Sequence, residues 1–280
     1  MLKSSIRGPR TIKTMFVVGL PRSGTTLLAH LLAGGPGLLT LSEPFLVHSV
    51  VAHWRLKRFL GKVAKTADLR TVPVPPEDAD ANEFLSYLKI LARKNRFNAL
   101  VIKETYRVTS HWENVALLDE IASEHAVAAI LRHPFDVALS SIRAFHWCRG
   151  AIGRALRLWA PGLPLFANNA ELVEHVGHNW SSYVNWCHRN ATFIVSYEDL
   201  VRDPRRHLRA LCEACDFTFD EEMVNGRPYR AFGGIGDPTV VHRPKPVSKA
   251  SVNRGRKLSP VLRELLLRTC GNTMSQLGYT

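Results

Sequence analysis

The sequence predicts an α/β fold in which a parallel sheet of about five strands is flanked by helices. Short apolar runs bounded by turn residues recur along the chain, as expected for strands buried on both faces. Segments with helical spacing of apolar residues separate these runs. A glycine-bounded loop links the first run to the first helical segment, which is typical of a P-loop-type sheet that holds phosphate at a helix N-terminus.

The first strand is expected at residues 15–20, where the run MFVVGL is apolar throughout. The further predicted strands are 38–42, 99–103, 126–131 and 192–197. The predicted helices are 25–33, 83–96, 113–124, 136–145, 170–190, 204–215 and 259–277. This alternation indicates βαβ crossovers and a doubly wound sheet, in which ligands collect at the carboxyl ends of the strands.

The chain of 280 residues is 46% hydrophobic, which is enough for one large α/β domain. No Gly/Ser linker, low-complexity tract or internal repeat divides it, so residues 14–280 are expected to form a single domain. Residues 1–13 are basic and are expected to be a disordered tail. The sequence has neither an apolar run of membrane-spanning length nor a signal-peptide core, so we expect a soluble, cytoplasmic protein.

The formal net charge is +13, and the basic residues are spread along the chain. That charge favours a basic cleft or face for a polyanionic small molecule, an acidic substrate or a membrane surface. Nucleic acid is not expected as a partner, because the sequence lacks zinc-finger, RNP and homeodomain patterns.

The five cysteines are scattered and odd in number, which argues against a disulfide framework. Cys212 and Cys215 form a C-x-x-C motif within a predicted amphipathic helix, and no second pair follows. Two half-buried thiols are the simpler interpretation, and zinc or redox chemistry is the alternative. The histidines lack metal-ligand spacing, so no metal site is expected.

Residues 19–26, GLPRSGTT, have the backbone pattern of a phosphate cradle. Thr25 stands where a P-loop that binds ATP carries a lysine, so the loop is a poor fit for Mg²⁺-dependent transfer from ATP. Arg22 supplies a cation instead. The other candidate anion contacts of the loop are Ser23, Gly24, Thr25 and Thr26. This set suits a nucleotide with one phosphate, or a phosphosulfate, at this end.

A second candidate anion site follows the strand at 126–131, in the segment RHPFDVALS. Arg132 lies at the strand end, Asp136 is expected to cap the next helix, and Ser140 falls within that helix. An arginine and a serine that converge on one point would grip a second phosphate. Two phosphate sites predict a nucleotide that is phosphorylated at both ends.

The segments LPRSGTT and LRHPFDVALSS resemble, in this order, the signature segments of sulfotransferases that use 3′-phosphoadenosine-5′-phosphosulfate (PAPS) and release 3′-phosphoadenosine 5′-phosphate (PAP). The segment VSYEDLVRDP and the stretch from residue 248 resemble later segments of that family. The resemblance implies a three-layer sulfotransferase fold, with the first loop on the 5′-phosphosulfate and the second on the 3′-phosphate. PAPS has no γ-phosphate, which agrees with the missing lysine.

The resemblance also implies the catalytic residues. Glu43, in TLSEPF, matches the general base of the tyrosylprotein and bacterial glycolipid sulfotransferases, and Lys103 matches the lysine that neutralises the bridging oxygen. Arg22 would place a positive charge beside the oxygens of the sulfuryl group. Thr105 stands where the cytosolic enzymes carry a histidine base, which favours a carboxylate, with Glu104 as the alternative base. The competing interpretations are that Glu43 pairs with Arg22 or caps a helix, and that Lys103 lies in solvent.

Three further cofactor contacts rest on the later segments. The match to the family's Y-E-D-L pattern places Tyr197 near the adenine or the 3′-phosphate, although a tyrosine at a strand end is commonly a packing residue. Ser251 and Arg256 lie in a basic C-terminal loop that would close over the nucleotide.

Two segments are candidates for binding the acceptor, and several classes of acceptor fit the sequence. Residues 48–63 and 144–170 are basic and aromatic, and they are candidate walls of an acceptor cleft, a lipid-surface contact, or helices that pack on the sheet. We expect in-line sulfuryl transfer to a hydroxyl, or secondarily an amine, of a small molecule, glycan or lipid. A P-loop nucleotide kinase and a non-catalytic module that binds PAP or another polyanion are the alternative functions.

Overall fold

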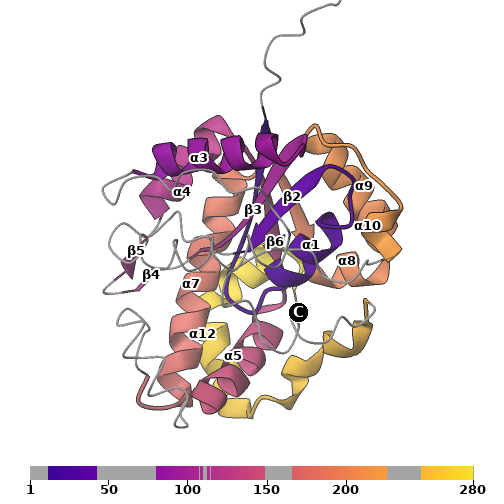
Figure 1. Cartoon of the computed structure of the whole chain (residues 1–280). Helices are drawn as coiled ribbons and strands as arrows, with labels where there is room; N and C mark the ends of the chain where they lie inside the picture. Colours follow the sequence, from indigo (N-terminus) through magenta and orange to yellow (C-terminus); the bar gives the residue numbers. More distant parts are fainter. Residues whose placement is uncertain are drawn as a thin grey trace, which may run out of the picture.

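A parallel sheet of five strands, in the order β2-β3-β1-β6-β7, forms the centre of the computed structural model (Figure 1). The strands are β1 (Lys13–Gly19), β2 (Leu38–Ser42), β3 (Ala99–Thr105), β6 (Ala126–Leu131) and β7 (Phe193–Ser196). The first strand of the chain is therefore the middle strand of the sheet, which places the loop that follows it between the loops of its two neighbours.

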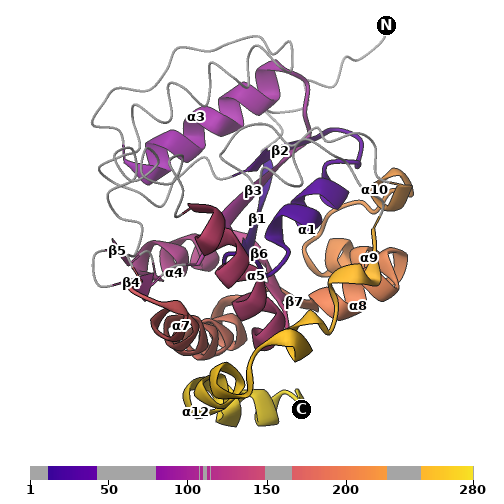
Figure 2. The same cartoon turned by 90° about the horizontal axis from the view of Figure 1, so that it is seen from below.

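Helices cover both faces of this sheet and give three layers. One face is covered by α1 (Thr25–Leu32), α8 (Tyr197–Arg202), α9 (Pro204–Ala214) and α10 (Glu222–Asn225). Packed on the other face are α3 (Ala81–Lys94), α4 (Val115–Glu124), α5 (Pro134–Cys148), α7 (Asn169–Asn190) and α12 (Pro260–Gln276). Figure 2 shows the sheet end-on, with α1, α8 and α9 on one side and α3, α4 and α7 on the other.

The structure describes residues 12–42, 80–106, 108–109, 112–113, 115–148, 166–225 and 247–279. Within these ranges, β4 (Val108–Thr109) and β5 (Trp112–Glu113) form an antiparallel pair, and two short 3-10 helices, η1 (Lys249–Ser251) and η2 (Arg254–Lys257), precede α12. The candidate cleft segment 48–63 and most of 144–170 lie outside the described residues.

The hydrophobic core lies on both faces of the sheet, because apolar residues in β1 alternate between them. Met15 and Val17 pack with α1 and α9, whereas Phe16 and Val18 pack with α3, α4 and α7. All four side chains are fully buried. A strand that is apolar on both faces belongs at the centre of a parallel sheet, where β1 is found.

The connections of β1 and β3 leave the sheet on opposite faces. β1 leads into α1 on one face, while its neighbour β3 leads toward α4 on the other. The loops at the carboxyl ends of these strands therefore diverge, and such a point in an open α/β sheet is where a ligand crevice forms. The glycine-bounded loop lies at this point.

The predicted fold class is confirmed, and the strands expected at 38–42 and 126–131 have those bounds in the structure. β1 begins at Lys13, before the apolar run, because Lys13 pairs in register with Ala99 of β3. Sequence periodicity did not predict α8, α10, the β4–β5 pair or the 3-10 helices. These elements have two to six residues, too few to show a period.

Among the described helices, none combines the length and the apolar composition that a membrane-spanning segment requires.

Candidate active site

The loop between β1 and α1 adopts backbone conformations that most residues avoid. Gly24 has φ 104° and Arg22 has φ 74°, so both lie in the left-handed region. Ser23 fixes the turn between them, because its N–H and its hydroxyl both donate to the carbonyl of Leu20, at 3.1 and 2.8 Å. Ser23 therefore uses both of its donors inside the loop. The first amides of α1 have no acceptor within the helix, and such amides are the donors that anions use.

Gly24 lies against the ring of Tyr197. A Cβ atom at position 24 would lie 2.4 Å from Cδ2 of Tyr197, which is closer than any real contact of this kind. Tyr197 is the first residue of α8 and is buried. The glycine is therefore required by the close approach of this ring as well as by its φ angle.

The two predicted anion segments are in direct contact. Nε of Arg22 donates to Oγ of Ser140 at 3.0 Å, and Nη1 of Arg132 donates to the carbonyl of Arg22 at 2.9 Å. The loop after β1 and the segment after β6 thus lie side by side at the carboxyl edge of the sheet, although more than a hundred residues separate them.

Arg132 contacts several other elements at this edge. Its Nη2 donates to the carbonyl of Ser251 at 2.6 Å, and its guanidinium carbon lies 4.4 Å from the centre of the Tyr197 ring. The backbone carbonyl of Arg132 accepts a hydrogen bond from the indole of Trp180 at 2.9 Å. These contacts hold a side chain that is only 8% exposed.

The ion pair of Arg132 with Asp136 is a long one. Nη2 of Arg132 lies 4.0 Å from Oδ2 of Asp136, and Nε of Arg132 is a buried donor without a hydrogen-bond partner among the described residues. Burial lowers the pKa of Arg132, and the nearby groups of Tyr197, Asp136 and Glu198 oppose that shift. Because a guanidinium has five N–H donors, an anion that reached this site would find donors to bind and would relieve the cost of burial.

The ring of Tyr197 contacts both anion segments. Gly24 lies on this ring, and the Arg132 guanidinium also stacks over it. The sequence left open whether this tyrosine contacts a nucleotide or only packs. The structure shows that its ring packs against Gly24 and the Arg132 guanidinium, and a contact with the nucleotide stays a prediction.

Lys103 lies at the carboxyl end of β3 and is 2% exposed, so it is not a solvent lysine. Its strand neighbours are Val17 of β1 and Ser42 of β2. Side chains alternate along β3, and Val101 packs on the face that α1 covers, so Lys103 lies on that face too. Glu104, the alternative base, is also buried but belongs to the opposite face.

The C-terminal loop reaches the same edge of the sheet. Ser251 contacts Arg132 through its backbone carbonyl, while Arg256 is exposed on η2. Glu43, the predicted base, lies outside the described residues. The structure therefore brings together Arg22, Arg132, Ser140, Tyr197 and Ser251, with Lys103 buried in the neighbouring strand.

A family model described as "Sulfotransferase family" matches residues 15–221, which include both anion segments, Lys103 and Tyr197. The chain belongs to the sulfotransferase family. The nodulation protein NoeE of Sinorhizobium fredii (strain NBRC 101917 / NGR234) is 29% identical over 140 residues, which make up 45% of this sulfotransferase but only 30% of NoeE.

Solved sulfotransferases have the same fold. The sulfotransferase domain from the curacin biosynthetic pathway is 20% identical, with a TM-score of 0.64 over 97% of this chain and 99% of that domain. The sulfotransferase domain of the olefin synthase from Synechococcus PCC 7002 is also 20% identical, with a TM-score of 0.59 over 95% of this chain and 96% of that domain. Mouse sulfotransferase SULT7A1, solved in complex with PAP, is 17% identical, with a TM-score of 0.51 over 95% of this chain and 88% of SULT7A1.

Sequence reasoning assigned Asp136 of the sulfotransferase to the wrong partner. We expected its carboxylate to cap α5, but it accepts hydrogen bonds from the backbone N–H groups of Asn253 and Gly255 in the C-terminal loop. The α5 N-terminus is instead capped by His133, whose Nδ1 accepts from the N–H of Phe135 at 3.2 Å. The partners of Asp136 lie 117 and 119 residues away, so local sequence carries no sign of them.

Trp180 and Glu198 were also missed. Trp180 supports the carbonyl of Arg132, and Glu198 accepts from the N–H of His133 at 3.0 Å and from the hydroxyl of Ser196 at 3.1 Å. Glu198 lies in the recognised Y-E-D-L segment, which was a usable signal. Trp180 lies in the middle of a long helix and gave none.

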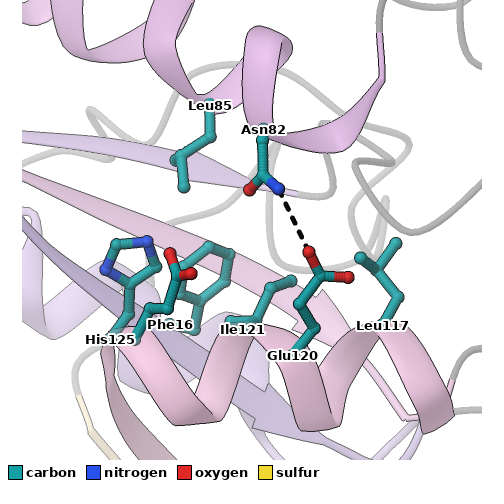
Figure 3. A pocket seen from close by; sticks show the side chains of 8 residues that line it. Phe16, Asn82, Leu85, Leu117, Glu120, Ile121 and His125 are labelled. Carbon is teal, nitrogen blue, oxygen red and sulfur yellow. Dashed lines mark hydrogen bonds between the residues drawn. The ribbon is translucent and has the colours of Figure 1, made fainter.

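The sulfotransferase also has a small hollow at the opposite edge of the sheet, between α3 and α4 (Figure 3). Phe16, Leu85, Leu117 and Ile121 supply its apolar lining, and Asn82 donates to Glu120 across it at 3.1 Å. Its lining includes no residue of the two anion segments. Within the described ranges, no group of histidine, cysteine and acidic residues is arranged to hold a metal ion.

Proposed function

We propose that this sulfotransferase transfers the sulfuryl group of PAPS to a hydroxyl of an acceptor and releases PAP. One observation carries the proposal: the loop after β1 and the segment after β6 meet through Arg22, Ser140 and Arg132. Two anion-binding segments in contact at one edge of a sheet suit one ligand with two separate anionic groups. That SULT7A1, which shares the fold, was solved with PAP supports the same ligand class.

The described residues fit such a nucleotide. The first amides of α1 are available as donors for the 5′-end. The buried Nε of Arg132 and the hydroxyl of Ser140 are donors for the 3′-phosphate. Bound PAPS would supply the activated sulfuryl group, and the chain would position it and balance its charge.

We assign different residues to different parts of the transfer. In-line transfer builds negative charge on the oxygens of the moving group and on the bridging oxygen. We assign Lys103 to the bridging oxygen, since its buried ammonium group lies on the face that α1 covers, and Arg22 to the sulfuryl oxygens. Glu43 directly follows β2, the strand beside β3, and is assigned as the base that accepts the proton of the acceptor hydroxyl.

The binding of PAP, AMP and ATP with Mg²⁺ tests the proposal by calorimetry. We expect PAP to bind at least about tenfold more tightly than AMP, because only PAP fills the second anion site. Arg132→Ala should weaken PAP binding by about 2–4 kcal/mol and remove the preference over AMP. Arg206→Ala, which removes an exposed arginine of α9, is the matched control and should leave both affinities unchanged. Equal binding of PAP and AMP, or tightest binding of ATP with Mg²⁺, would contradict the proposal.

A further inference from the structure

Asp136 connects the second anion segment to the C-terminal loop. Its two carboxylate oxygens accept from two different backbone amides, Oδ2 from Asn253 at 2.9 Å and Oδ1 from Gly255 at 2.5 Å. The carboxylate side chain is 1% exposed. A buried carboxylate that receives two backbone N–H groups is a strong local tie, since charged acceptors make the stronger hydrogen bonds.

The loop is shaped to reach Asp136. Asn253 has φ 59°, in the left-handed region, which turns the chain between η1 and η2. Gly255 packs directly on the start of α5, because a Cβ atom there would lie 2.4 Å from Cβ of Phe135 and 2.9 Å from the nitrogen of Asp136. The loop therefore touches α5 with backbone atoms on both sides of the carboxylate.

The same loop is tied to Arg132. Nη2 of Arg132 donates to the carbonyl of Ser251, so two residues four positions apart in sequence, Arg132 and Asp136, hold neighbouring points of one loop. The loop between those points and just after them carries Arg254, Arg256 and Lys257. Its position therefore decides where three basic residues stand relative to the guanidinium assigned to the 3′-phosphate.

We propose that Asp136 is a positioning residue for the 3′-end of the nucleotide: it holds residues 251–257 against α5, so that the loop stays beside Arg132 as a basic cover of the second anion site. This inference rests on the proposed function for the identity of the ligand, and on the contacts above for the tie itself.

A role of Asp136 through its charge and a role in holding the loop predict opposite effects when the carboxylate is removed. If the carboxylate acted only through its charge, its removal would strengthen the binding of an anion. If it holds the loop, its removal weakens binding, and only for a ligand that has a 3′-phosphate. Asp136→Asn keeps the size of the side chain but replaces one acceptor oxygen with an NH₂ group, which cannot accept from the second amide.

The test compares Asp136→Asn with Asp119→Asn. Asp119 also accepts two N–H donors, from Trp186 and Asn190, but it lies on α4, so its variant changes the net charge equally without touching the loop. In Asp136→Asn we expect PAP affinity to fall at least about tenfold and AMP affinity to stay within threefold. Amide exchange of residues 247–258 should rise in the nucleotide-free protein. Asp119→Asn should match the wild type in all three measurements.

Gly255→Ala is an independent second variant, which pushes the loop off α5 without changing any charge. It should reproduce the loss of PAP affinity and the faster exchange, even if Asp136→Asn folds poorly. Unchanged or tighter PAP binding in folded Asp136→Asn, or unchanged exchange of the loop, would overturn the positioning role. A wild-type chain that bound PAP and AMP equally would instead overturn the proposed function, while the exchange measurement would still report on the tie.

Discussion

Lys103 shows how burial separates two interpretations of one residue. From sequence, a lysine at the end of a strand is as compatible with solvent exposure as with catalysis. In the structure it is 2% exposed and lies beside Ser42, the last residue of β2. A buried lysine needs a structural or functional reason, because desolvation of its ammonium group is costly. Stabilisation of the charge on a bridging oxygen is such a reason.

Replacement of the two assigned catalytic groups should reduce turnover far more than nucleotide binding. We expect Lys103→Met to lower kcat about 10²–10³-fold, and Glu43→Gln to lower it about 10²–10⁴-fold. The affinity for PAP should stay within about threefold in Glu43→Gln, because Glu43 is assigned to the acceptor. In Lys103→Met it should fall far less than kcat does, because the bridging oxygen stays on the 5′-phosphate of PAP but carries its developing charge in the transition state. The measurement is release of PAP from PAPS in the presence of an acceptor that supports wild-type turnover, together with calorimetry of PAP binding.

Two results would contradict that assignment. Full turnover in either variant would remove that residue from the chemistry. A wild-type chain that binds PAP but never releases it from PAPS, whatever the acceptor, would favour the non-catalytic module. Melting temperatures of both variants provide the control for folding.

Local sequence patterns predicted which residues lie together at the carboxyl edge of the sheet, but not which residues make long-range contacts there. Arg22, Arg132 and Ser140 were singled out because glycines, a strand end and a helix start mark their positions, and the structure brings all three together. The roles of Asp136 and Trp180 depend on elements more than forty residues away, so no local pattern indicates them.

At the scale of elements, long periodic segments were predicted to within three residues at each end, and short ones were not predicted. The helix predicted at 204–215 is α9, Pro204–Ala214, which begins with Asp203 as its cap and a proline in its first turn. α8, which precedes it, has six residues and was not predicted, and only its first residue, Tyr197, was assigned to the end of the preceding strand. A helix of six residues that begins at a serine cap is too short to show a periodic pattern of apolar residues.

The C-x-x-C motif of α9 is a pair of core thiols. Cys212 and Cys215 are both buried, and burial raises the pKa of Cys212 to about 11 and that of Cys215 to about 12. Thiols with raised pKa are poor nucleophiles and poor metal ligands at neutral pH, since the thiolate is the reactive form. The interpretation as packing residues is the one that the structure supports.

Because of these thiols, the stability of the folded chain should depend on pH in the alkaline range. In the unfolded chain a thiol loses its proton near its ordinary pKa of about 8.5, whereas in the folded chain it holds the proton until about pH 11–12. The free energy of unfolding should therefore be unaffected by these groups below about pH 8 and should fall as pH rises above about 9. Urea unfolding between pH 7 and 10.5 measures it. Cys212→Ala/Cys215→Ala, less stable at pH 7, should show a shallower fall, and equally steep profiles would contradict the prediction.

At the scale of the whole molecule, the net charge of +13 should assist the approach of an anionic ligand. Attraction between distant charges is screened by salt, whereas hydrogen bonds within the site are screened much less. We expect the association rate constant of PAP to fall roughly tenfold between about 20 and 500 mM NaCl, with a smaller change in the dissociation rate constant. Stopped-flow mixing measures both. AMP, with less charge, is the control and should show a weaker dependence, and a salt-independent association rate would argue against steering.

The contact between Gly24 and Tyr197 has a consequence for how related sequences diverge. The tyrosine ring occupies the space that any side chain at position 24 would need. In a descendant of this sequence, a larger residue at position 24 would need a smaller residue at position 197 and would still carry the strain of a φ angle of 104°. Residues in such contact do not contribute independently. The two positions should therefore be inherited as a pair, with the order of the two changes fixed by which of them can be made alone.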